Sequence, residues 1–191
     1  MERAQSENSS PSGELPRHLA QPSNRFLGDD GNPDPLVRGA LAAVTGQVSY
    51  SRAVVALCAS RLLMPIVASG DETGEHDPER RAEMAAVTLS DQGTSYLLAF
   101  TGMDAMRAWQ SDARPVLCHL DELAASVVPA GATELLLDMA GPTPFVLAGE
   151  LLAAIAEGNR LVEFEDGDFA WVRMAPQDSA SSPAGPADGR L

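Results

Sequence analysis

The apolar segments of this sequence are all short, and this restricts what the chain can fold into. The longest candidate, residues 53–68, is interrupted by Arg61 and Pro65, whereas a membrane-spanning helix needs about 20 consecutive apolar residues. The first residues, Met-Glu-Arg-Ala-Gln-Ser-Glu, have no apolar signal core behind them. We therefore predict a globular protein without a membrane contact, and we expect it in the cytoplasm.

The periodic segments lie in the middle of the chain. Residues 1–33 are rich in Ser, Pro, Asn, Gly and acidic side chains without any periodicity, and residues 175–191 have a similar character. Segments of this kind bury too little apolar surface to offset the entropy lost on ordering. The composition therefore predicts one domain, residues 34–174, between two disordered tails.

Within residues 34–174, strand-like runs occur in hairpins as well as around helices. Asp91-Gln92-Gly93 separates two such runs, and this is a hairpin signal in which Gly supplies a positive φ. Asp34-Pro35 predicts a helix start, with Asp34 as the N-cap, and a second helix follows Ser49. The predicted class is α+β, with a small mixed or antiparallel sheet, flanking helices and an N-terminal helical pair.

Three residues carry more local predictions. Pro65 lies within a strand-like run and cannot donate to a strand ladder, so we expect it at a sheet edge or a bulge. Thr101 and Asp104 fit a capping box that opens a helix ending near Gln110. Residues 133–139 are apolar on both faces, which is typical of a central strand.

The charge balance excludes several functions. The formal net charge is −14, with 27 acidic and 13 basic residues, and every basic residue is Arg. Nucleic-acid binding needs a clustered basic face, and anionic membranes repel an acidic protein, so neither is an expected partner. Without Lys there is no phosphate-binding P-loop and no Schiff-base catalysis. We predict no cofactor.

The residue types used in catalysis and metal binding do not form a recognisable set. Cys118 and His119 are adjacent, so on a strand their side chains point to opposite faces and cannot form a catalytic pair. Residues 30–34 alternate oxygen ligands as a calcium loop does, but Pro35 and Leu41 occupy positions where an EF-hand needs Gly and Glu. No catalytic residue and no metal ligand is therefore predicted.

Two acidic features remain open to more than one interpretation. Asp138 ends an apolar strand, where a perturbed pKa can be functional, although we favour a role in accepting backbone N–H bonds from the turn at residues 140–142. The acidic residues between positions 163 and 168 are interpreted as a solvated hairpin rather than a cation site.

A series of short segments runs through the chain in a fixed order. These are Arg25 to Gly31 with Asp34-Pro35, Leu62 to Ile66, Glu83 to Leu89, Ala99-Phe100-Thr101, Trp109, Ala113 to Val116, Leu137 to Pro142, Pro144 to Leu147 and Ala156-Glu157-Gly158. In this order they resemble the SseB N-terminal domain family, in a short, single-domain bacterial form, over about residues 25–158. The resemblance implies a fold and a family, and it brings no catalytic motif with it.

The resemblance is densest on the helix at residues 101–110 and on the turn at residues 141–145, and each places a large apolar side chain beside a turn. We therefore expect Trp109 and Phe145 to belong to a surface that binds a protein partner. The predicted function is a non-enzymatic interaction or regulatory module. The alternative is a small enzyme or ligand-binding domain whose site uses no recognisable motif.

Overall fold

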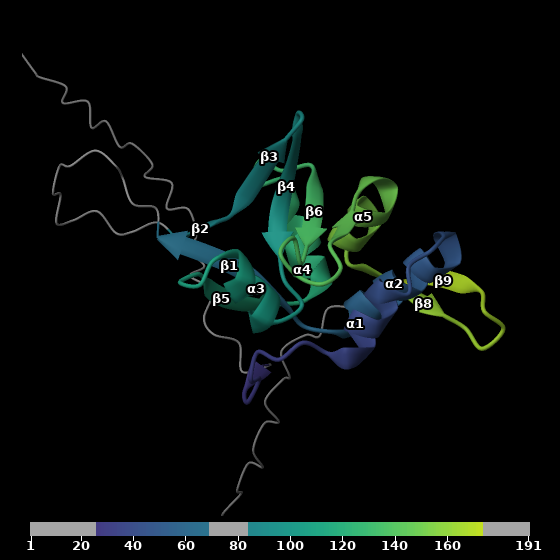
Figure 1. The fold of residues 1–191 in the computed structure, drawn as a ribbon. Coiled ribbons are helices and arrows are strands. Elements are labelled where there is room, and N and C mark those ends of the chain that lie inside the picture. Colours follow the sequence, from purple (N-terminus) through teal and green to yellow (C-terminus); the bar gives the residue numbers. More distant parts are fainter. Residues whose placement is uncertain (1–25, 69–83, 174–191) are drawn as a thin grey trace, which may run out of the picture.

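The computed structural model describes residues 26–68 and 84–173 (Figure 1). The predicted tails fall outside these residues, except for residues 26–33, which contact the domain. The ring of Phe26 lies against His119, with centroids 5.1 Å apart, and Asp29 forms an ion pair with Arg61 at 2.7 Å. Residues 26–33 therefore pack against the domain, where a disordered tail was predicted, because polar contacts hold a segment that has little apolar surface to bury.

Five helices are present in the described residues, and the first two form the predicted N-terminal pair. Asp34 caps the first helix by accepting a hydrogen bond from the Leu36 backbone N–H at 2.8 Å, as predicted. The helices are α1 (Pro35–Ala42), α2 (Gln47–Ala59), α3 (Met103–Trp109), α4 (Leu120–Val127) and α5 (Gly149–Ala156).

The strands of the described residues form three small sheets, which confirms the predicted α+β class. The first, in the order β2-β1-β5, is antiparallel and consists of β1 (Leu62–Ala68), β2 (Met84–Ala86) and β5 (Arg114–Cys118). The second, in the order β3-β4-β6-β7, contains β3 (Thr88–Asp91), β4 (Thr94–Ala99), β6 (Glu134–Leu137) and β7 (Phe145–Leu147). The third is the hairpin of β8 (Asn159–Glu163) and β9 (Phe169–Arg173).

The four-stranded sheet is mixed, because β4 and β6 run parallel while its other pairs are antiparallel. Gln92 and Gly93, with φ values of 47° and 88°, connect β3 to β4 and confirm the predicted hairpin turn. The central position of β6 is also as predicted. Leu63 of β1 and Phe100, just beyond β4, exchange two backbone hydrogen bonds of 2.8 Å, and these join the first sheet to the second.

The prediction for Pro65 needs a correction, because β1 is the middle strand of its sheet. Pro65 lies directly opposite Pro115 in β5, and β2 pairs only with residues 66–68 of β1. Two prolines that face each other have no N–H to offer, so they occupy a non-hydrogen-bonded position of the ladder. The chain thus tolerates Pro65 at a place where pairing with β2 has not begun.

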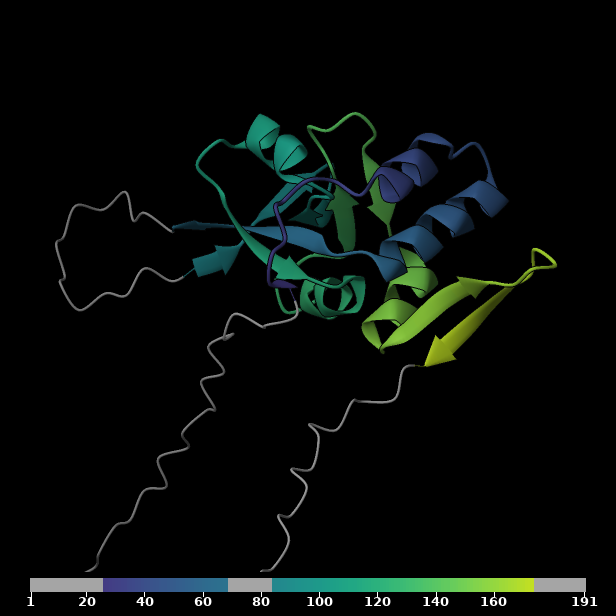
Figure 2. The same ribbon diagram turned by 90° about the horizontal axis from the view of Figure 1, so that it is seen from below.

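The core lies mainly on one side of the four-stranded sheet. Leu97, Ala99, Leu135 and Leu137 are buried in one cluster with residues of α1, α2, α4 and α5. Figure 2 shows the ribbon of these strands and helices from below. The alternate residues of the same strands point the other way, into a second and smaller cluster that includes residues of α3. The helices therefore cover the two faces of this sheet unequally.

Candidate partner-binding face

The less covered side of the four-stranded sheet carries a row of apolar side chains. Leu98 of β4 lies beside Leu136 of β6, and Leu136 lies opposite Val146 of β7. Leu98 is buried, Leu136 is half-buried and Val146 is 38% exposed. In the part of the chain that the structure describes, α3 is the helix that contributes to this cluster. We call the set Leu98, Leu136, Val146 and Trp109 the outer face.

Trp109 lies at the end of α3, where that helix meets the outer face. Its indole stacks on Phe100 with ring centroids 5.6 Å apart and planes inclined by 29°. Trp109 is half-buried, whereas Met106, one turn earlier, is fully buried. The helix thus uses Met106 to pack into the second cluster, and the indole of Trp109 remains partly accessible at the edge.

A buried carboxylate holds the start of α3 to the end of β6. Asp138 is 0% exposed and accepts hydrogen bonds from the Thr101 backbone N–H at 2.8 Å and from the Thr101 hydroxyl at 2.6 Å. Two predictions are therefore corrected. Thr101 is not the N-cap, since Gly102 takes that position. The Asp138 side chain bonds residue 101 rather than the following turn, which donates from Gly141 N–H to the Asp138 carbonyl.

Arg38 of α1 supplies the positive charge beside this carboxylate. Its Nε lies 3.3 Å from Asp138 Oδ2 and donates to the Thr101 hydroxyl oxygen, while its Nη2 donates to Asp104 Oδ1 at 2.8 Å. Burial raises the pKa of the Asp138 carboxyl, and the Thr101 hydrogen bonds and the Arg38 charge partly oppose that shift. The carboxyl is thus occupied in joining α1, β6 and α3.

The turn after β6 packs directly against α3, so the two segments that the sequence predicted to be neighbours do lie together. A Cβ added to Gly141 would lie 2.9 Å from the Asp138 Cβ and 3.1 Å from the Ala105 Cβ, so a side chain at this position would force the turn and α3 apart. Phe145, however, is only 6% exposed and stacks on Tyr50 with centroids 4.8 Å apart. Because residues alternate along β7, Phe145 belongs to the main core and not to the outer face.

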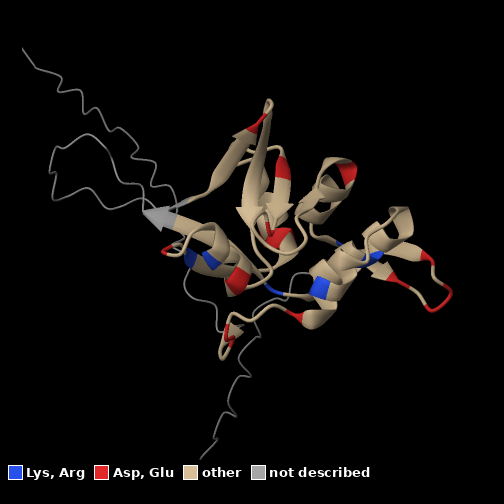
Figure 3. Cartoon of the chain, viewed as in Figure 1, with Lys and Arg blue, Asp and Glu red and all other residues tan. Residues whose placement is uncertain are grey.

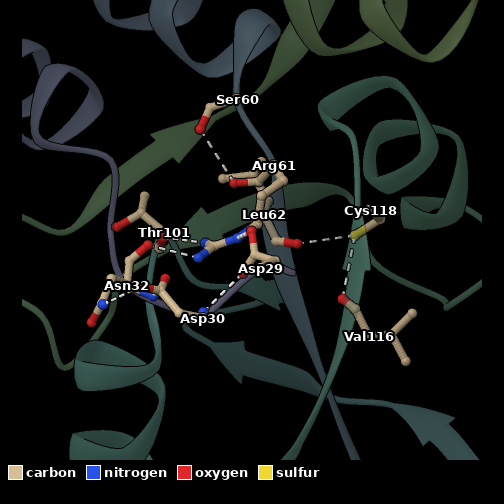
Figure 4. A network of polar contacts seen from close by, with 10 residues as sticks. Asp29, Asp30, Asn32, Ser60, Arg61, Leu62, Thr101, Val116 and Cys118 are labelled. Atoms are coloured by element: carbon tan, nitrogen blue, oxygen red, sulfur yellow. Dashed lines mark hydrogen bonds and ion pairs between the residues drawn. The ribbon is translucent and has the colours of Figure 1, made fainter. Parts of the chain in front are cut away.

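Arg61 fastens the N-terminal segment to the same region (Figure 4). It donates from Nε to Asp29 Oδ2 at 2.7 Å, from Nη1 to the Thr101 carbonyl at 2.7 Å, and from Nη2 to the Asn32 carbonyl at 2.6 Å. The hydrogen bond from Arg61 is the main reason that the pKa of Asp29 is lowered. One guanidinium therefore ties residues 29–32 to the start of α3.

Gly31, in the N-terminal segment that Arg61 holds, lies at a position that requires glycine. Its φ is +78°, and a Cβ at this position would overlap with Cγ of Met103. The Gly31 carbonyl also accepts a hydrogen bond of 2.8 Å from the Met103 backbone N–H. Both the backbone conformation and the close approach to α3 require glycine here.

The two cysteines are buried and unpaired. Burial raises the pKa of the Cys118 thiol to about 12 and raises that of Cys58 as well, so both remain thiols near neutral pH. His119 follows Cys118 at the start of α4, where its backbone N–H donates to Glu122 Oε2 at 2.8 Å. Neither thiol is poised as a nucleophile.

The residues that resemble a calcium loop are engaged with their own neighbours. Asp30 accepts hydrogen bonds from the backbone and the side chain of Asn32, and Asp34 caps α1. Across residues 26–68 and 84–173, no group of three or more His, Cys, Asp or Glu side chains is placed to hold a metal ion. Over the same residues, no helix combines the length and the apolar character needed to cross a bilayer.

The β8–β9 hairpin carries exposed apolar side chains that sequence reasoning missed. Phe164, Trp171 and Val172 are 54%, 43% and 40% exposed. The sequence interpretation had considered only the acidic residues of this hairpin, of which Glu163 is paired with Arg52 at 2.7 Å. The alternation of large apolar residues in the last strand was the available signal.

The fold defines an α+β domain, and sequence comparison supplies the family. The model of the SseB protein N-terminal domain family matches residues 37–154. The match covers more than half of the 191 residues, so this chain belongs to the SseB family. It spans α1 to α5 and includes the outer face. No curated protein and no solved structure matches the chain.

Proposed function

We propose that this SseB-family protein is a non-enzymatic interaction module that holds a protein partner on its outer face, with Trp109 as an anchor. The observation that carries this proposal is the row of apolar side chains on a sheet face that α3 covers incompletely. On this face Leu136 and Trp109 are half-buried and Val146 is 38% exposed, and apolar side chains that remain accessible side by side are typical of interaction sites. Large aromatic residues contribute a disproportionate share of binding energy at such sites.

The network around α3 supports the proposal, because a rigid surface loses little entropy when a partner binds. Thr101 lies just before the Gly102 N-cap of this helix, and it is fixed on both sides, since its N–H donates to Asp138 and its carbonyl accepts from Arg61. Gly141 and Gly31 allow close packing against the same helix. The buried polar groups of this region thus support a prearranged surface.

The side chains that could carry chemistry have structural roles in the described residues. The Asp138 carboxyl accepts two hydrogen bonds from Thr101 and neighbours Arg38, and burial keeps the two cysteines protonated. These roles favour an interaction module over an enzyme.

The test compares surface variants in a pull-down from an extract of the native organism, followed by mass spectrometry. Val146→Arg places a charge on the outer face at a position that is already 38% exposed. We expect this variant to keep its melting temperature and to lose the partner that the wild type recovers. Trp109→Ala should lose the same partner.

Val128→Arg is the matched control, because Val128 is 80% exposed at the end of α4, a helix that packs on the main core side of the sheet. It should recover the partner at the wild-type level. Equal recovery with Val146→Arg and Val128→Arg, both stably folded, would remove the outer face from consideration.

A further inference from the structure

The hairpin has a strand edge that no other described strand occupies. The β8–β9 sheet has two strands, so one edge of β9 has no strand beside it within the described residues. The hairpin is nevertheless firmly placed, since Leu161 is buried in the main core and Arg160 forms an ion pair of 3.7 Å with Asp121 of α4. An unpaired edge on a fixed hairpin is a template for pairing with another strand.

The backbone groups at this edge can be assigned from the pairing of the hairpin. The Phe164 backbone N–H donates to the Asp168 carbonyl, so Asp168 faces β8. Along a strand the hydrogen-bonding direction alternates. Phe169, Trp171 and Arg173 therefore direct their backbone N–H and C=O groups away from β8, towards the free edge.

The charges along this strand are arranged with opposite signs at its two ends. Glu165, Asp166 and Asp168 lie at the turn that precedes β9, and Arg173 ends it. The acidic tip is visible at the end of the hairpin in Figure 3. A strand that is acidic at its start and basic at its end is complementary to an antiparallel copy of itself.

We propose that two copies of this chain form a symmetric dimer by pairing their β9 strands in antiparallel orientation along this free edge. A two-fold axis at an antiparallel pair places one residue opposite its own copy. With the axis at Trp171, all five residues of β9 overlap. This goes beyond the proposed function, because it concerns a different surface and a different partner.

This register brings exposed side chains of the two copies together, and Arg173, which lies 4.0 Å from Glu157 of its own chain, is still 68% exposed. Trp171 lies opposite the Trp171 of the second copy, Ala170 lies opposite Val172, and Phe169 lies opposite Arg173, beside its acidic turn. Aromatic pairs and a cation over an aromatic ring stabilise neighbouring strands, and no like charges face each other. The net charge of −14 opposes association less than it suggests, because charges farther apart than about 8 Å are screened at physiological ionic strength.

Sedimentation velocity of the full chain over a wide concentration range tests the proposal. We expect a concentration-dependent species of twice the chain mass. Trp171→Arg and Trp171→Glu should each be monomeric, since like charges would meet on the two-fold axis, and circular dichroism should show that both remain folded. An equimolar mixture of the two variants should form the dimer again, because opposite charges then meet at that position.

Val128→Arg, an equal charge change away from the hairpin, should leave the wild-type dimer unchanged. A wild type that is monomeric at every concentration would overturn the proposal and leave the edge to a different protein. A dimer that persists in Trp171→Arg would place the interface elsewhere. Failure of the mixed variants to associate would contradict the register.

Discussion

The free-energy cost of burying the Asp138 carboxylate depends on its partner, Arg38. Asp138 is fully buried and the Arg38 side chain is 16% exposed, with 3.3 Å between Nε and Oδ2. Taking a carboxylate out of water is costly unless an opposite charge and hydrogen bonds compensate it. Arg38 also bonds Asp104, but that carboxylate is 56% exposed, so its contribution is small.

We predict that Arg38→Met lowers the free energy of unfolding by about 3–5 kcal/mol, because it leaves the Asp138 charge buried without compensation. Asp104→Ala, the control, should cost about 0–1 kcal/mol. Combining Arg38→Met with Asp138→Asn should recover part of the loss. Urea denaturation of the four proteins measures this, and equal costs for Arg38→Met and Asp104→Ala would contradict it.

The contribution of the Asp138 carboxyl to stability depends on pH, and the direction of its pKa shift determines the sign of that dependence. Burial raises the pKa of Asp138 above its ordinary value of 3.8, so the folded protein holds this proton more tightly than the unfolded chain. Its contribution to the free energy of unfolding therefore increases as the pH falls through the raised pKa towards 3.8. The stability of the wild type relative to Asp138→Asn should rise in that window, and a fall would mean that the pKa is lowered instead.

At the scale of elements, β6 divides its side chains between the two faces of the sheet. Leu135 and Leu137 are 0% exposed in the main core, while Leu136, between them, is half-buried on the outer face. Since the three side chains are identical, the difference in their exposure shows that the outer face of the sheet is less completely covered than the main core side. The proposal that a partner binds the outer face rests on this division.

We predict that Leu135→Ala and Leu137→Ala each lower the free energy of unfolding by about 2–5 kcal/mol, as fully buried leucines do. Leu136→Ala should cost about 1 kcal/mol, because less apolar area leaves water at this position. Chemical denaturation provides the measurement. If Leu136→Ala is as costly as its neighbours, the outer face is covered in the folded protein and the proposed function fails.

At the scale of the whole molecule, the chain combines a strong excess of acidic residues with a complete absence of Lys. We predict that divalent metals, nucleotides and common cofactors leave its melting temperature unchanged, and that treatment with a chelator does so too. A compound that binds the folded state must raise the melting temperature in a concentration-dependent way. A saturating shift of several degrees with one compound would instead support the alternative of an enzyme or ligand-binding domain.

Much of the secondary structure could be predicted because its signals are local. The cap at Asp34, the turn at Gln92 and Gly93 and the central strand at residues 134–137 depend on residues within a few positions of one another. Trp109 was placed on α3 for the same reason. The fold class follows from the order of such elements, and the family from the order of short segments along the chain.

The amino-acid sequence by itself thus determined the elements, the α+β class and the family. Only the tertiary structure decided which side chains meet. Asp138 bonds Thr101, which is 37 positions away, and Arg38 reaches the same residue across 63 positions. The tertiary structure also placed Phe145 in the main core and left Trp171 exposed. Such contacts depend on how sheets and helices pack, and no local spacing of residues encodes that packing.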